Sequence, residues 1–257
     1  MKLIPNKLRQ TVLTMVHGNG SGHIGGSFSI AEAVAYLYSN FNLIEGDGDK
    51  LVLSKGHSIP IVYAALYELG LISDDDLKKF RQIDSPLQGH PHKLALPYIH
   101  ASTGSLGQGL SIAIGHAMGM RMRGQTTKSF CIIGDGESQE GQIWEALMLA
   151  PRHKLGNLVC FIDRNGGQGD GPVDDILSLG DLHAKVKAFG WNTRTINGHD
   201  VWEIDQAVNS VKADTPTCII CNTIKGRGVS FIEGGWHARV PNDDEYKMAM
   251  EELDEGN

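Results

Sequence analysis

The fold is indicated most directly by Phe130-Cys131-Ile132-Ile133-Gly134-Asp135-Gly136-Glu137-Ser138-Gln139-Glu140-Gly141, an apolar run that ends in an acidic, glycine-rich turn. Apolar residues in succession, bounded by such a turn, are typical of a strand buried on both faces. A second run of this kind is Val159-Cys160-Phe161-Ile162, and it ends in Asp163-Arg164-Asn165-Gly166-Gly167. Together they predict neighbouring parallel strands whose polar turns lie at one edge of a sheet.

Helical and extended patterns alternate along the rest of the chain. Helices are expected over residues 6–17, 29–38, 59–69, 73–80, 106–122, 143–150, 179–189 and 202–211. Strands are expected over residues 51–53, 129–133, 158–162, 191–196 and 217–221. Strands separated by helices predict an α/β fold with a doubly wound, mostly parallel sheet flanked by helices, as a single domain over residues 1–257.

Composition and charge exclude several classes of protein. The 257 residues carry 23 Lys and Arg against 30 Asp and Glu, a net charge of −7, which argues against a generally basic protein that binds nucleic acid. No run approaches the roughly 18 apolar residues of a membrane span, so no membrane association is expected. The N-terminal residues lack the apolar core of a signal peptide, and we expect a cytoplasmic protein.

Cys218 and Cys221 form a C-x-x-C pattern, which could indicate a redox or metal site. They lie in an apolar run that predicts a strand, and alternation along a strand would direct the two side chains to opposite faces. We therefore favour a buried strand over a redox or metal site.

The two polar turns carry the residues of a candidate cofactor site. Asp135, Asn165 and a free carbonyl in the following turn are hard oxygen ligands of the kind that Mg²⁺ or Ca²⁺ prefers. A helix expected to begin near Ser138 would direct its N-terminal amides at the same place, which favours a phosphate. A metal ion with a diphosphate is the simplest ligand that satisfies both. The Gly-Asp-Gly turn alone is common, and Gln139 occupies the third glycine position of the dinucleotide fingerprint, which therefore fails.

The segment 134–165 resembles the thiamine-diphosphate-binding motif, and residues 5–253 are similar to the N-terminal part of transketolase. The similar segments occur in the same order as in that family. They are Ser21-Gly22-His23, Leu53-Ser54-Lys55-Gly56-His57, Gln88-Gly89-His90-Pro91, Ala101-Ser102-Thr103-Gly104-Ser105-Leu106-Gly107-Gln108-Gly109, Lys225-Gly226-Arg227-Gly228-Val229 and Trp236-His237.

The resemblance implies a role for each matching residue. It implies that Mg²⁺, for which Ca²⁺ or Mn²⁺ can substitute, is held by Asp135, Asn165 and the Gly167 carbonyl. It implies a wider set of residues around thiamine diphosphate: Lys55, His57, Gly104, Ser105, Leu106, Asp135, Gly136, Glu137, Asn165, Lys225 and His237. It also implies a catalytic set: His23, His57, His90, His237 and Glu140. Imidazoles suit a sugar-binding mouth because they can donate or accept hydrogen bonds and can transfer protons near neutral pH.

Glu140 has two interpretations. As an acid in the first turn of a helix it would interact favourably with the helix dipole. In the family its counterpart lies at a subunit interface and couples two active sites.

The implied activity is the transfer of a two-carbon ketol unit. In full-length relatives the catalytic glutamate belongs to a pyrimidine-binding domain that follows this one, and the sequence stops at Asn257. We therefore expect the N-terminal subunit of a split transketolase. It would be active only with a partner that carries the pyrimidine-binding and C-terminal domains, in an α₂β₂ assembly.

Three functions remain open at this point. The first is transfer from a ketose phosphate to an aldose phosphate. The second passes the unit to a carrier-protein or lipoyl thiol in specialised biosynthesis. The third is a non-catalytic scaffolding paralogue, which the intact metal ligands disfavour. His92 and His100 occupy positions where the family usually has acids. The resemblance implies that both lie beside the substrate mouth, so the identity of the acceptor stays open.

Overall fold

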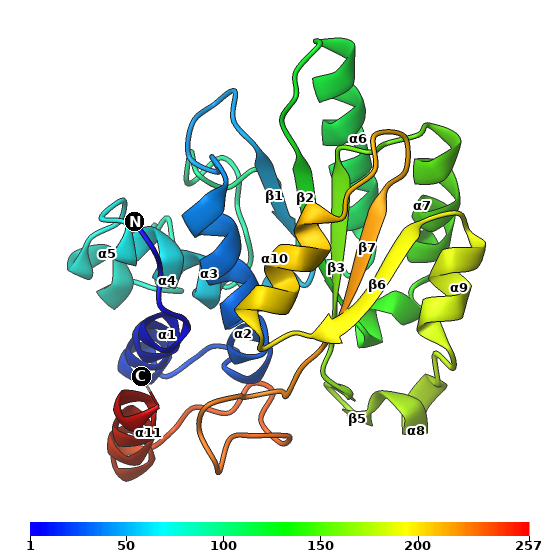
Figure 1. Cartoon of the computed structure of the whole chain (residues 1–257). Helices are drawn as coiled ribbons and strands as arrows, with labels where there is room; N and C mark the ends of the chain where they lie inside the picture. The colour runs from blue at the N-terminus through cyan, green and yellow to red at the C-terminus, as the bar shows by residue number, and fades with distance from the viewer. Residues whose placement is uncertain (257) are drawn as a thin grey trace.

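The computed structural model describes residues 1–256, so Asn257, the last residue of the predicted domain, lies outside the described residues. Within them, five strands form one sheet in the order β1 (Lys50–Leu53), β2 (Ser129–Gly134), β3 (Leu158–Arg164), β7 (Thr217–Asn222) and β6 (Asn192–Asn197). Every neighbouring pair in this sheet is parallel. The predicted α/β fold with a mostly parallel sheet is confirmed (Figure 1).

Helices cover both faces of the sheet, as Figure 1 shows. One face is packed by α6 (Gln108–Met122), α7 (Gly141–Arg152) and α9 (Leu182–Ala188). The other is packed by α1 (Pro5–Asn19), α3 (Ala31–Asn40), α4 (Pro60–Glu68) and α10 (Val201–Asn209). The shorter helices are α2 (Gly25–Phe28), α5 (Asp74–Lys78) and α8 (Val173–Leu177), and α11 (Asp243–Glu255) ends the described chain.

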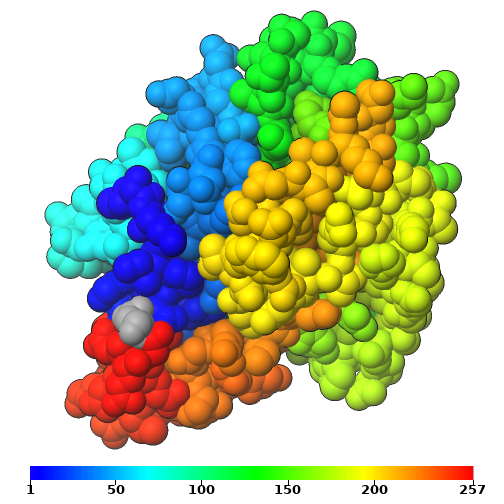
Figure 2. Space-filling view, viewed as in Figure 1, coloured from blue at the N-terminus to red at the C-terminus, as the bar shows by residue number. Residues whose placement is uncertain are grey.

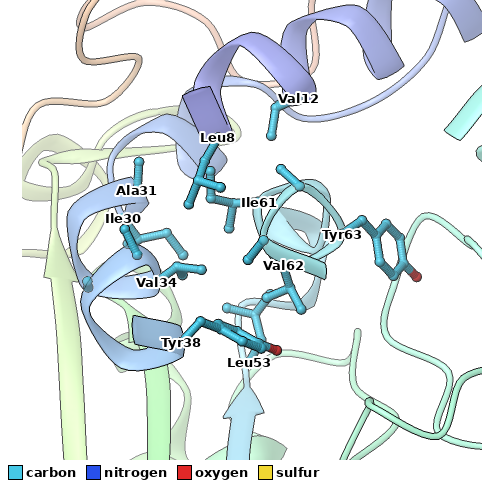
Figure 3. Close-up of a cluster of buried hydrophobic side chains, with 14 of the residues drawn as sticks. Leu8, Val12, Ile30, Ala31, Val34, Tyr38, Leu53, Ile61, Val62 and Tyr63 are labelled. Carbon is cyan, nitrogen blue, oxygen red and sulfur yellow. The ribbon is translucent and has the colours of Figure 1, made fainter. Parts of the chain in front are cut away.

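The core follows from side-chain alternation along the buried strands. In β2, Phe130 and Ile132 pack with α1, α3 and α4, whereas Cys131 and Ile133 pack under α6 and α7. Figure 3 shows the first of these clusters, where Leu8, Val34 and Ile61 meet between three helices. Each of the three is fully buried, and each burial stabilises the fold by about 2 kcal/mol.

The cysteines of the C-x-x-C pattern behave as a buried strand predicts. Cys218 belongs to the cluster beneath α6 and α7, and Cys221 belongs to the cluster on the opposite face of the sheet. Both are free thiols. The interpretation as a strand is confirmed, and the two side chains cannot act on one ligand.

Several predicted helices have different bounds in the structure, and two of them begin later for a visible reason. The helix expected over residues 29–38 is α3, which begins two residues later at Ala31, because Ile30 (φ −110°, ψ 15°) leaves the helical conformation after α2. The buried Ser29 hydroxyl lies 2.7 Å from Asp163 Oδ2 and 3.0 Å from Gly26 O. The helix expected over residues 179–189 begins at Leu182, since Gly180 is left-handed and the Asp181 side chain caps the Ala184 amide.

The helix expected near Ser138 begins later. A 3-10 turn occupies Gly136–Gln139, Glu140 is extended, and α7 begins at Gly141. The predicted helix N-terminus is therefore wrong by one turn, because Asp135 accepts a hydrogen bond from Gly136 N and starts the tighter turn instead.

The first and last helices lie side by side. The Gln10 side-chain amide donates to Asp254 in α11 at 2.6 Å, and Figure 2 shows the two ends of the chain adjoining on one face. Within residues 1–256, no helix combines the length and apolar character that a membrane span requires.

Candidate functional site

A cleft of about 390 Å³ opens at the carboxyl ends of β1, β2 and β3. The strands end just before Ser54, Asp135 and Asn165, and their turns form its floor. The structure brings most of the predicted site residues to this cleft. They are His23, Lys55, His57, Gly104, Leu106, Asp135, Gly136, Glu137, Glu140, Asn165, Gly167, Lys225 and His237.

His90 and Ser105 adjoin the cleft without being part of its lining. The His90 ring covers Gly104, where an added Cβ would lie 3.1 Å from His90 Cδ2. Ser105 has an exposed side chain next to Gly104.

The sequence interpretation missed one wall of the cleft. This wall is the hairpin of β4 (Gly167–Gln168) and β5 (Gly171–Pro172), whose Gln168, Gly169 and Asp170 line the cavity. The signal was present in the run Gly166-Gly167-Gln168-Gly169-Asp170-Gly171, whose central Gly169-Asp170 is a two-residue loop of the Gly-Asp type that favours a hairpin.

Asp135 and Asn165 are fixed by main-chain amides and by a neighbouring carboxylate. Asp135 accepts hydrogen bonds from Gly136 N and Gly166 N at 2.8 and 2.6 Å. Asn165 donates from Nδ2 to Asp163 (2.6 Å), which turns its carbonyl oxygen toward the Gly167 amide at 3.1 Å. Burial, aided by the charge of Asp163, raises the pKa of Asp135 to about 6. A cation at this carboxylate would remove that cost.

The polar atoms of the cleft fit a hard cation with a diphosphate. Gln168 Oε1 is buried and has no hydrogen-bond partner within residues 1–256, and it occupies the space that a side chain on Gly136 would need. No three His, Cys, Asp or Glu side chains of the described chain converge as metal ligands. A cation here would therefore use one carboxylate, one amide oxygen and main-chain carbonyls, a set that suits Mg²⁺. Asp135, Asn165 and Gly167 all line the cleft and could supply these oxygen ligands.

A buried ion pair lies beneath the cleft. Lys55 Nζ contacts Asp163 Oδ2 and donates to Gly26 O at 2.9 Å. Asp163 also accepts from Ser29 and Thr223. Burial alone would raise the pKa of Asp163, but the charge of Lys55 and these hydrogen bonds hold it below its usual value. Sequence reasoning missed this role of Asp163, because only the tertiary fold brings it to Lys55.

Three imidazoles form a triangle at the mouth. The ring centroids of His23, His57 and His237 lie 5.1 to 5.2 Å apart. Burial, followed by the charge of His237, lowers the pKa of His23 to about 4. Burial and the charge of Lys55 lower the pKa of His57 to about 2. These rings are therefore neutral near pH 7, and each offers one donor and one acceptor nitrogen. His237 Nδ1 is buried without a hydrogen-bond partner in the described residues.

The two glutamates have different surroundings. Glu137 is buried, and its oxygens accept from the Ser54 hydroxyl and from the amides of Gly107 and Gly134. Its carboxylate therefore ties the turn before α6 to the end of β2. Glu140 is exposed at the rim of the cleft, in the N-cap position of α7.

The interpretation of His100 as a residue beside the mouth is wrong. His100 is buried behind β1, where its Nδ1 accepts a hydrogen bond from Leu51 N at 3.0 Å, and it does not line the cleft. His92 is exposed and also lies outside the cleft lining.

Comparison with known proteins identifies the family to which a chain with this cleft belongs. Residues 1–249 match the family described as transketolase, thiamine diphosphate binding domain. The chain is 40% identical over 259 residues to a 6-deoxy-6-sulfo-D-fructose transketolase subunit of Clostridium sp. (strain MSTE9), covering 97% of this chain and 94% of the relative. It is 35% identical over 265 residues to an apulose-4-phosphate transketolase subunit of Phocaeicola vulgatus, covering 99% and 94%.

The fold matches solved structures closely. A transketolase from Campylobacter jejuni superposes with a TM-score of 0.92 at 32% identity, covering 97% of this chain and 42% of that chain. This chain thus spans about two fifths of the length of that transketolase.

Proposed function

Because the chain belongs to the transketolase family through its thiamine diphosphate binding domain, we propose that it is the N-terminal subunit of a split transketolase. It would transfer a two-carbon ketol unit from a ketose donor to an aldose acceptor. The observation that carries the proposal is the cleft at the carboxyl ends of β2 and β3, where oxygen donors and Lys225 surround space for a metal ion and a diphosphate.

Thiamine diphosphate, when bound, would supply the carbon centre that accepts and releases the ketol unit. Asp135, Asn165 and the Gly167 carbonyl would hold Mg²⁺, and Gly136 would let the diphosphate approach the main chain. Lys225 and His57 would face the diphosphate. His23, His90 and His237 would bind the hydroxyls and carbonyl of the sugar and transfer protons. Burial lowers the pKa of each ring, so each is neutral near pH 7 and can both donate and accept a hydrogen bond to the sugar.

The proposal includes a partner subunit. The relatives that this chain matches almost end to end are named as transketolase subunits. We propose that the pyrimidine-binding and C-terminal domains, with the catalytic glutamate, belong to that partner, and that two copies of each chain form an α₂β₂ enzyme. The exposed position of Glu140 at the cleft rim suits contact with the partner. A cytoplasmic location is part of this proposal, consistent with four free cysteines.

A sugar acceptor is favoured over a carrier-protein thiol. The two relatives compared above are named for sugars that bear a sulfo or a phosphate group. We propose a ketose with a terminal anionic group as donor and an aldose phosphate as acceptor. The intact donor set of the cleft argues against a non-catalytic scaffold.

The test is reconstitution with the partner. The tagged chain is used to capture its partner from the native extract, and the stoichiometric partner is then co-expressed with it. The pair should transfer a two-carbon unit from a ketose phosphate to an aldose phosphate only with thiamine diphosphate and Mg²⁺, and the chain alone should be inactive. Failure of the cofactor-loaded pair across both phosphorylated and sulfonated ketoses would refute the proposal, and activity of the single chain would refute the need for a partner.

A further inference from the structure

A buried polar network lies behind the cleft and is not part of its lining. Arg9 of α1 donates from Nη2 to both carboxylate oxygens of Glu32 in α3, at 2.7 and 2.8 Å. The same nitrogen donates to Phe28 O, at the end of α2, at 3.0 Å. Arg9 is 2% exposed and Glu32 is 7% exposed. These hydrogen bonds offset part of the cost of burying the two charges, while Arg9 Nε has no partner among the described residues.

His199 connects this pair to the segment that precedes Lys225. Its Nδ1 lies 3.0 Å from Glu32 Oε2, and its Nε2 lies 2.8 Å from the main-chain nitrogen of Ile224. A main-chain amide can only donate, so Nε2 is the unprotonated acceptor and Nδ1 carries the proton toward Glu32. Burial would raise the pKa of Glu32, but the hydrogen bond from His199 and the charge of Arg9 hold it below its usual value. Glu32 is thus a charged acceptor that selects this tautomer.

Ile224 directly precedes Lys225, whose ammonium group lines the cleft. On the other side of Lys225, Gly226 N donates to Gly25 O at 3.0 Å, and Gly25 is followed by the cleft residue Gly26. The His199 contact therefore fixes the Thr223–Ile224 peptide group, one residue before Lys225, while Arg9 fixes the end of the helix that contains Gly26. One network holds both segments from behind.

We infer that Glu32 and His199 are positioning residues for the cofactor cleft. Arg9 holds Glu32, Glu32 selects the tautomer of His199, and the acceptor nitrogen of that tautomer fixes the Ile224 amide and with it the direction of Lys225. The inference rests on the proposed function to the extent that Lys225 faces the diphosphate.

Two variants separate positioning from simple structural support. In His199→Asn the side-chain amide reaches only the Nδ1 position, so a donor to Glu32 is kept and the acceptor for Ile224 is lost. In His199→Gln the amide oxygen reaches the Nε2 position, so the acceptor for Ile224 is kept and the donor at the Nδ1 position is lost. A purely structural network would respond similarly to both changes.

The first measurement is hydrogen exchange of the full chain without cofactor. Amide exchange at Ile224 should quicken about tenfold in His199→Asn, since its one hydrogen bond is removed, and should stay within about twofold in His199→Gln. Unchanged exchange at Ile224 in His199→Asn would overturn the inference.

The second measurement is the calorimetric affinity of the partner complex for thiamine diphosphate with Mg²⁺, in a double-mutant cycle with Lys225→Ala. His199→Asn should weaken binding about fivefold when Lys225 is present and less than about twofold when it is Ala. An equal loss in both backgrounds, or an equal loss in His199→Gln, would show a merely structural role. Absence of any binding by the wild-type complex would refute the proposed function, whereas the exchange measurement would still decide whether His199 holds the loop.

Discussion

Lys55, which lines the cleft, forms an ion pair with Asp163, and the two side chains are 2% and 0% exposed. Removing one member of such a pair leaves an uncompensated charge in the interior. Asp163→Asn should therefore lower the free energy of unfolding by about 3 kcal/mol. Urea denaturation measures this loss, with the exposed Asp170→Asn as the matched control. A loss below about 1 kcal/mol would mean that Lys55 finds water or another partner.

Asp135 is the carboxylate best placed to hold a metal ion. Asp135→Ala should weaken Mg²⁺-dependent binding of thiamine diphosphate to the complex at least about tenfold, as expected for loss of a metal contact. Calorimetry with and without Mg²⁺ measures the effect. Asp170→Asn, which removes another carboxylate from the cleft lining, should leave affinity near wild type. Equal affinity of Asp135→Ala and wild type would remove Asp135 from the metal site.

His237 has a buried ring nitrogen without a partner in the described residues, at the mouth of the cleft. His237→Ala should fold normally but lower kcat of ketol transfer about 100-fold, within the range for loss of a proton-transferring group. Steady-state kinetics and thermal unfolding should be measured together, with the exposed His153→Ala as control. Turnover equal to wild type would place the substrate mouth elsewhere.

His100 makes stability depend on pH. Burial, followed by the charge of Lys50, lowers its pKa in the folded chain to about 4, whereas the unfolded value is about 6.5. The unfolded state therefore binds more protons below pH 6.5, and stability is lost as pH falls from that value toward 4. Between pH 7.5 and pH 5 the loss from this residue should be about 2 kcal/mol.

His100→Asn is the control for that titration, because its side-chain oxygen can accept from Leu51 N in place of Nδ1 without titrating. Urea denaturation at both pH values should show that the variant loses about 2 kcal/mol less stability than wild type. An identical pH dependence would show that His100 is protonated as readily in the folded chain as in the unfolded one.

Two glycines of α6 should respond in opposite ways to alanine. A Cβ on Gly109 would collide with Ser54 Cβ and lie 2.7 Å from Ser54 Cα, so Gly109→Ala should destabilise the fold by about 2 kcal/mol. Gly115 has no atom within 4 Å of that position in the described chain, so Gly115→Ala should stabilise by about 0.5 kcal/mol. Thermal unfolding of the pair tests the close approach of α6 to β1, and the same sign for both would contradict it.

Local patterns predicted much of the sheet and part of the cleft. Asp135 and Asn165 each follow an apolar run, and parallel strands place their ends at one edge, so their proximity was predictable. The pairing of β7 between β3 and β6 was not, because no local pattern specifies strand order. Lys225 and His237 follow β7, and only family resemblance assigned them to the site.

The errors have the same physical origin. Ser29 lies in a helical pattern, but it ends the short helix α2 and its hydroxyl binds Asp163, far along the chain, so α3 begins only at Ala31. His100 is close in sequence to Gly104, yet the main chain turns it beneath β1. Long-range contacts decide both positions, and propensity does not report them.

The strand order has a consequence for synthesis. β3 is complete at Arg164, but its neighbour β7 begins at Thr217, and β6 is made earlier although it pairs only with β7. A ribosome needs a few seconds to add these roughly 50 residues. During that interval one side of β3 has no strand to pair with, and β6 has none at all. For those seconds the nascent chain has unpaired strand edges, which a chaperone or the neighbouring helices must shield from pairing with other unfinished chains.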